Sequence, residues 1–216
     1  MKKAFTMLEL VFVIVGIGII SATVLPSTKT NPLAEAATQL VSHIRYTQHL
    51  AMVDDKFNSS DNEWYKKRWQ LIFQPVKDSG GEIAYSIFSD NNLSSNYDGK
   101  PTVSDNEIAE HILDKSKYMS GGTHSLINTS KKVDKKMNLT YSYGIESYEI
   151  KGNNCNNSTR IVFDYLGRPI YKTLTSYNQS YKNNRLIEGE CNITLKSSEG
   201  SITITINSET GYSYIR

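Results

Sequence analysis

Residues 1–26 read MKKAFTMLELVFVIVGIGIISATVLP, and this stretch decides how the chain is organised. One carboxylate, Glu9, precedes an apolar run that has no charged residue from Leu10 to Leu25. A carboxylate in a membrane-spanning helix is costly, so such a residue usually marks a functional partner. At about 1.5 Å per residue, residues 5–25 form a helix of roughly 31 Å, which is enough to cross a bilayer. The segment is therefore predicted to be a transmembrane helix that carries one functional acid.

This spacing resembles the N-terminus of the type IV pilin superfamily, the prepilins and pseudopilins. In that family a short basic leader is removed before an aromatic residue, and a glutamate is fifth in the mature chain. The resemblance implies a leader of residues 1–4, cleavage between Ala4 and Phe5 by prepilin peptidase, and N-methylation of Phe5. Glu9 is then the fifth mature residue, and Pro26 falls where the family commonly has proline. Ala4 departs from the family's usual glycine, but alanine is the next smallest side chain.

The resemblance also implies a role for Glu9 in assembly. After cleavage the α-amine of Phe5 is a cation in or near lipid, and Glu9 of a neighbouring subunit can neutralise it. Each charge then offsets the burial cost of the other. The implied partners are other pilins or pseudopilins in a filament, prepilin peptidase and the inner membrane. An ion pair between Phe5 and Glu9 within one helix is the alternative.

Three other interpretations compete for the N-terminal segment. Lys2 and Lys3 followed by an apolar run suit a secretory signal peptide cut near Ala22, although an acid early in the run counts against it. A plain signal anchor explains the length of the segment but not Glu9. A buried core helix would show a polar face, which this segment lacks.

The composition indicates a folded body. The chain has 216 residues, of which 38% are hydrophobic and 21% charged, typical of one globular domain plus an anchor, or of two small domains. The net charge is +2, and Lys2 and Lys3 supply both of the excess positive charges. Removal of the leader leaves 22 basic and 22 acidic side chains, so the formal net charge of the mature chain is zero. This balance weakens a default assignment as a nucleic-acid-binding protein.

Lys2 and Lys3 also predict the orientation, because they are the only charges before Glu9. The positive-inside rule then places the N-terminus in the bacterial cytoplasm and the body in the periplasm. A location in a cell-surface filament is the alternative. Cys155 and Cys191 would lie in an oxidising compartment and are predicted to form a disulfide. Two buried reduced thiols are the alternative. Two ligands alone cannot make a tetrahedral metal site.

Residues 26–54 are predicted to continue as an amphipathic helix, bent near Pro26. Apolar residues there recur at steps of three and four: Leu33, Ala37, Leu40, Val41, Ile44 and Ala51. Residues 55–216 are predicted to form a globular β-rich periplasmic domain. The fold class is therefore α+β, with a long N-terminal helix packed on an antiparallel β-sheet body, as in pilins.

Within the body the pattern predicts a hairpin of residues 69–73 and 83–88 around a Gly-Gly turn. A short helix is predicted over residues 106–113. Further strands are predicted at residues 139–143, 148–150, 161–163, 170–173, 192–195 and 202–206.

The C-terminal third resembles minor pseudopilins of the GspH/FimT type. Phe163, Gly167 and Arg168 form a Phe-x-x-x-Gly-Arg pattern, which two closing strands and Thr210-Gly211 follow. The resemblance implies an assembly subunit of a type II secretion pseudopilus or a type IV pilus, at or near the filament tip. Gly167 is expected to supply a turn, and Arg168 to brace a nearby carbonyl.

DNA binding for natural transformation is the alternative function, because some FimT-like proteins take part in DNA uptake. They use two arginines after the C-terminal glycine, whereas here Tyr212 replaces the first and only Arg216 remains. Arg168 and Arg216 are the candidate DNA-binding residues. DNA is therefore not the favoured partner.

The sequence predicts no enzyme, no metal site and no cofactor. The four histidines, His43, His49, His111 and His124, lack metal-ligand spacing, and no Gly-x-Ser-x-Gly elbow is present. A secreted enzyme is therefore the least favoured hypothesis. Asn92 and Asn192 fit an acidic-extended sequon and are candidate N-glycosylation sites.

Overall fold

A computed structural model describes residues 6–24, 31–76, 80–91, 97–104, 106–122, 125–127, 129–181 and 185–216. The chain divides into two compact units, Met1–Asn31 and Pro32–Arg216. Of the residues singled out above, Lys2, Lys3, Ala4, Phe5, Pro26, Asn92 and His124 lie outside the described residues.

The first unit contains α1 (Met7–Val24), an 18-residue helix. Its backbone starts with a bond from the Glu9 N–H to Oγ1 of Thr6 (3.3 Å), the pattern of an N-terminal cap. Every described side chain from Met7 to Ser21 except Gly16 is exposed. Among the helices of the described residues, none combines the length and the apolar character needed to cross a membrane.

The second unit begins with α2 (Pro32–Val53), whose first residue is a proline, a common first helical position. One face of α2 is buried in the body: Leu33, Ala36, Ala37, Leu40, Val41, His43, Ile44, Thr47 and Ala51. The predicted start at residue 26 and the bend at Pro26 cannot be compared, because they lie outside the described residues.

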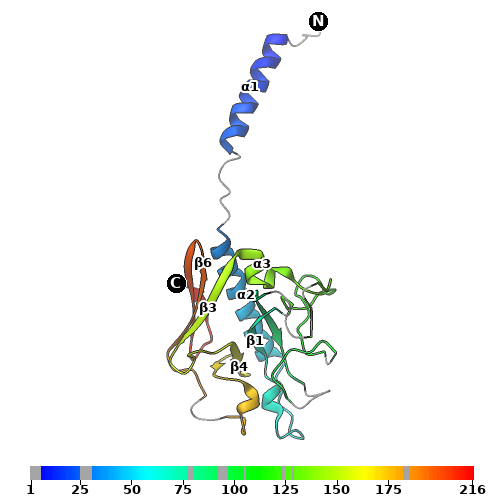
Figure 1. The fold of residues 1–216 in the computed structure, drawn as a ribbon, viewed down its shortest axis with the longest axis vertical. Helices are drawn as coiled ribbons and strands as arrows, with labels where there is room; N and C mark the ends of the chain where they lie inside the picture. Colours follow the sequence, from blue (N-terminus) through cyan, green and yellow to red (C-terminus); the bar gives the residue numbers. More distant parts are fainter. Residues whose placement is uncertain are drawn as a thin grey trace. The chain divides into compact units, whose positions relative to one another are not determined.

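Two antiparallel four-stranded sheets form the rest of the framework (Figure 1). The first has the order β2-β1-β4-β5, with β1 (Gln70–Pro75), β2 (Ile83–Phe88), β4 (Arg160–Phe163) and β5 (Pro169–Ile170). The second has the order β3-β6-β7-β8, with β3 (Ile145–Gly152), β6 (Glu190–Ser197), β7 (Gly200–Asn207) and β8 (Ser213–Ile215). Short helices complete the described part: η1 (Trp64–Lys67), η2 (Lys135–Met137), α3 (Leu139–Tyr143) and η3 (Leu174–Ser176).

The main core lies where α2 meets both sheets. Leu40 and Ile44 of α2 are fully buried, and they share one cluster with side chains of the first sheet (Leu71, Phe73, Ile87) and of the second (Ile193, Ile204). Each such side chain stabilises the fold by about 1.5–3 kcal/mol. The structure thus confirms the α+β class, with an N-terminal helix packed on antiparallel sheets.

The predicted hairpin is present, and β1 and β2 pair over six residues from Gln70↔Phe88 to Pro75↔Ile83. The strand predicted over residues 139–143 is wrong, because this segment is the helix α3. The Asn138 side chain caps it by accepting from the Tyr141 N–H (3.0 Å), and Gly144 ends it with a left-handed φ of 66°. These caps override the β-propensity of the residues between them.

The helix predicted over residues 106–113 is also wrong. Asn106 has a φ of 60°, which breaks a helix, and isolated bridges join Ile108 to Phe88 and Glu110 to Tyr118. The segment is therefore extended and pairs with the end of β2 at Phe88 instead of forming a helix. The strand predicted over residues 170–173 stops at Ile170, because Lys172 has a φ of 70°.

Candidate functional site

Glu9 lies in the first turn of α1, where the helix dipole favours a negative charge. Its side chain is exposed, and no cation of the described residues lies within ion-pair distance of it. Ala4, Phe5 and Pro26 cannot be placed beside it. Glu9 is thus available to a cation from outside α1, set in an otherwise apolar helix surface.

Arg168 follows the β4–β5 turn and binds a buried carboxylate. Its Nε and Nη2 each lie 2.8 Å from Oδ2 of Asp164, whose side chain is fully buried. The other Asp164 oxygen, Oδ1, accepts from the backbone N–H groups of Leu166 (3.0 Å) and Arg168 (2.9 Å). Arg168 therefore braces the turn through a carboxylate, and the expectation that it braces a carbonyl is wrong.

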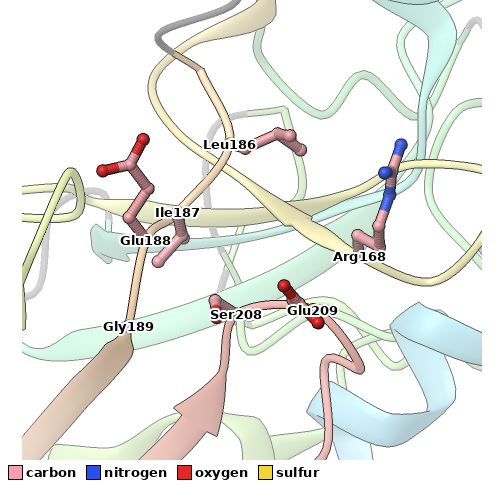
Figure 2. A pocket seen from close by; sticks show the side chains of 7 residues that line it. All are labelled: Arg168, Leu186, Ile187, Glu188, Gly189, Ser208 and Glu209. Atoms are coloured by element: carbon pink, nitrogen blue, oxygen red, sulfur yellow. The ribbon is translucent and has the colours of Figure 1, made fainter.

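Arg168 also borders an open hollow of about 500 Å³ (Figure 2). Figure 2 shows Arg168 on one side of the hollow and Glu188 on the other, with Ser208 and Glu209 between them. The lining carries two carboxylates and one cation, and Asp164 already neutralises that cation. The electrostatics of this hollow therefore disfavour a phosphate ligand.

Arg216 lies in a different place, next to strands β6 and β8. Its Nη1 is 3.3 Å from Oε2 of Glu190, so it too has a carboxylate partner. Among the described residues, no hydrogen bond or ion pair links Arg216 to Arg168, and their carboxylate partners differ. The two candidate DNA-binding arginines thus belong to separate sites, and each one is ion-paired.

An aromatic pair lies near Arg216. The rings of Tyr212 and Tyr214 are stacked with centroids 5.8 Å apart, and Cζ of Arg45 lies 5.2 Å from the Tyr212 centroid. Nη2 of Arg45 also donates to the Ser213 carbonyl oxygen (2.6 Å). The helical pattern presents Arg45 only as a polar spacer on α2, so nothing in the sequence indicates this long-range contact.

The structure contains the predicted disulfide between Cys155 and Cys191, with the two Cα atoms 6.0 Å apart. Both residues are buried. The bridge joins the loop after β3 to the start of β6. It fixes the end of the second sheet near Gly152, where an added β-carbon would overlap the Glu190 carbonyl oxygen.

Asn192, the described glycosylation candidate, lies inside β6, where its side chain is half-buried. Its Oδ1 accepts a hydrogen bond from Oγ1 of Thr205 (2.7 Å). Glycosylation of Asn192 stays a prediction.

Two of the histidines, His43 and His111, have structural partners. Nδ1 of His43 lies 2.7 Å from the Tyr85 hydroxyl, which also accepts from Nε2 of Gln39 (3.0 Å). Burial lowers the pKa of His43 to about 4, so the ring is neutral at pH 7 and its Nδ1 can accept a hydrogen bond from the Tyr85 hydroxyl. Nε2 of His111 lies 3.4 Å from Oδ2 of Asp134. In the part of the chain that the structure describes, no three metal-ligating residues come together.

Comparisons of the chain with protein-family models, with curated proteins and with solved structures find no match. The residues and geometry above therefore carry the functional proposal by themselves.

Proposed function

We propose that this chain is a minor pilin or pseudopilin of the GspH/FimT type, a non-enzymatic subunit of a type II secretion pseudopilus or a type IV pilus. One observation carries the proposal: α1 exposes its apolar side chains, Phe12 to 70% and Ile20 to 63%, and begins with a single carboxylate, Glu9. A contiguous apolar surface of this kind marks contact with lipid or protein. If α1 is buried among other subunits and lipid in the assembled filament, its apolar side chains are covered there, and Glu9 has a partner on a neighbouring subunit.

Processing follows from the N-terminal pattern. Prepilin peptidase removes residues 1–4, cuts between Ala4 and Phe5, and methylates the new N-terminus. The Phe5 amine then pairs with Glu9 of a neighbouring subunit, and the pairing favours assembly in register because either charge alone is costly in an apolar environment. In this proposal residues 5–25, a longer segment than α1, anchor the subunit in the inner membrane, with the body on the periplasmic side.

The body supports this assignment by its construction. α2 and the two sheets share one core, so the chain presents a rigid domain after the apolar helix. The disulfide between Cys155 and Cys191 fits an oxidising periplasm.

Intact mass spectrometry of the full-length chain, co-expressed with a prepilin peptidase, tests the processing. We expect a mass lower by residues 1–4 and higher by one methyl group. A product cut near Ala22 would instead identify a signal peptide.

DNA binding for natural transformation is the second candidate, and one observation favours it. The stacked rings of Tyr212 and Tyr214, with Arg45 over the former, form a surface on which nucleic-acid bases can stack. The ion pair of Arg168 counts against it, because a phosphate would have to displace the fully buried Asp164 carboxylate. The Arg216–Glu190 pair is exposed and opposes a phosphate only weakly.

A further inference from the structure

A second hollow, of about 280 Å³, lies beside the start of β4 and is distinct from the Arg168 hollow. Of the eight described residues that line it, two are cations, Arg160 and Lys172, and none is acidic. Each of the other six carries a hydroxyl or an amide, among them Ser158, Thr159, Thr173 and Ser176. Every lining side chain can therefore form hydrogen bonds, and the charged ones are positive.

Arg160 is the buried cation of this site, with 9% of its surface exposed. Its Nη1 donates to Oε1 of Gln70 (2.8 Å) and to the Gly99 carbonyl oxygen (3.1 Å), which are both neutral acceptors. Its buried Nε has no hydrogen-bond partner among the described residues. Burial lowers the pKa of Arg160 to about 10, while Asp90 and Asp98 act to raise it, so Arg160 stays charged at pH 7. Asp90 and Asp98 thus stabilise the charge from a distance, while the direct acceptors at Nη1 are neutral and Nε has none in the described part of the chain. An anion that reaches Nε would supply its missing hydrogen bond.

Lys172 is the exposed cation, and the fold holds it in an unusual backbone conformation. Its φ is 70°, a left-handed value that a lysine seldom adopts. The preceding residue, Tyr171, is fixed on both sides: its N–H donates to the Arg185 carbonyl (2.7 Å), and its own carbonyl accepts from the Tyr177 hydroxyl (2.6 Å). Such conformations persist only where the surroundings impose them, and they are common at ligand sites.

The hydroxyl groups of the hollow divide into two kinds. Ser176 Oγ donates to the Thr173 carbonyl (2.7 Å), so toward a ligand this oxygen is left as an acceptor. Ser158 Oγ donates to the Arg160 carbonyl (2.7 Å) and accepts from the Arg160 N–H (3.2 Å), which leaves it one lone pair for a ligand. Lys172 and the side chains of Thr159 and Thr173 supply donors. The site thus offers donors to an anion and acceptors to hydroxyl groups, a combination that suits a sugar carrying an acidic group.

We propose that this hollow binds an acidic sugar, a monosaccharide unit that carries a carboxylate or a phosphate. The volume is at the low end for ligand pockets, which fits a single sugar unit. None of the described residues that line the hollow belongs to α1.

Isothermal titration calorimetry on the full-length chain in non-ionic detergent tests the proposal with four probes: glucuronate, glucose 6-phosphate, inorganic phosphate and glucose. We expect a millimolar or tighter Kd for at least one acidic sugar and binding at least about tenfold weaker for neutral glucose. The stronger of the two acidic sugars identifies the acidic group. Inorganic phosphate that binds as tightly as the sugars would overturn the sugar assignment.

Substitutions at Lys172 and Lys151 distinguish a loss of binding from a loss of folding. Lys172→Gln should weaken binding at least about tenfold. Lys151→Gln should leave it unchanged, because Lys151 pairs with Glu149 and does not line the hollow. Lys172→Gly removes the cation at a position whose φ suits glycine, so it folds at least as stably and should lose binding equally. No heat with any anion, or full binding by both Lys172 variants, would overturn the site.

Discussion

Gly211 packs against the carbonyl oxygen of Gly167 so closely that a β-carbon on Gly211 would overlap that oxygen. Both glycines have left-handed φ values, 77° at Gly167 and 65° at Gly211. Nε2 of Gln48 donates to the carbonyls of Gly167 (2.8 Å) and Thr210 (2.7 Å). One side chain of α2 therefore holds together the β4–β5 turn of the first sheet and the β7–β8 turn of the second.

Gly211→Ala should destabilise the body by about 2–4 kcal/mol, because it adds both left-handed strain and a steric overlap. The measurement is chemical denaturation followed by circular dichroism. Gly144→Ala is the matched control, since Gly144 has a similar φ of 66° but no heavy atom beyond its chain neighbours lies within 4 Å of where its β-carbon would be. It should lose only about 1 kcal/mol. Equal losses in the two variants would show that the contact between the turns contributes nothing.

The disulfide should be complete in protein recovered from the periplasmic side. Alkylation without reductant should label neither Cys155 nor Cys191. Reduction should lower the free energy of unfolding by up to about 4 kcal/mol, because the bridge closes a loop of 36 residues. The double variant with serine at both positions serves as the control and should not respond to reductant. Quantitative labelling of both cysteines in the oxidised protein would contradict the bridge.

The body should lose stability as the pH falls below that of neutral solution. His43 has a folded-state pKa of about 4 against 6.5 for an ordinary histidine, so the unfolded chain binds the proton first. The neutral His43 contributes fully to the free energy of unfolding above pH 6.5. This contribution declines toward pH 4, and at pH 5 the free energy of unfolding is lower by about 2 kcal/mol. Urea unfolding at pH 7.5 and pH 5 measures it. His43→Gln should remove this part of the pH dependence, whereas the exposed His49→Gln should keep it; a wild-type slope in His43→Gln would refute the assignment.

DNA should bind weakly at near-physiological salt. Arg168 and Arg216 are ion-paired, and each additional phosphate contact contributes only about one unit of log–log salt slope. A mobility-shift titration of the full-length chain measures the affinity, with Arg45→Ala and Arg216→Ala as variants. Micromolar or tighter binding that either substitution abolishes would promote the DNA-uptake alternative.

Local patterns predicted much of the framework. The hairpin of β1 and β2 follows from two β-rich runs around a Gly-Gly turn, and the buried face of α2 follows from its three- and four-residue steps. The strand predicted over residues 139–143 is wrong because the composition favours a strand, while the caps at Asn138 and Gly144 impose a helix. Local capping interactions outweighed the β-propensity of these five residues.

The sites were harder to predict, because their contacts join residues far apart in the chain. Gln48 and Gly167 are separated by 119 positions, and no periodic pattern connects them. The burial of Asp164 decides the role of Arg168, and burial of a single polar residue is not visible in the sequence. The sequence did not indicate Arg160 either, because the burial of its Nε without a hydrogen-bond partner arises only when the body packs.

Filament entry of a Glu9 variant tests the proposed function most directly. Glu9→Leu makes α1 more apolar, so the protein should still insert and be cleaved, while the Phe5 amine of a neighbour loses its counter-charge. Glu35→Leu is the control, because Glu35 is an exposed acid in the first turn of α2. Crosslinking to the other pilins of the assembly, measured in the membrane fraction, should be lost in Glu9→Leu and retained in Glu35→Leu. Undiminished crosslinking of cleaved Glu9→Leu protein would contradict the role of Glu9 in assembly.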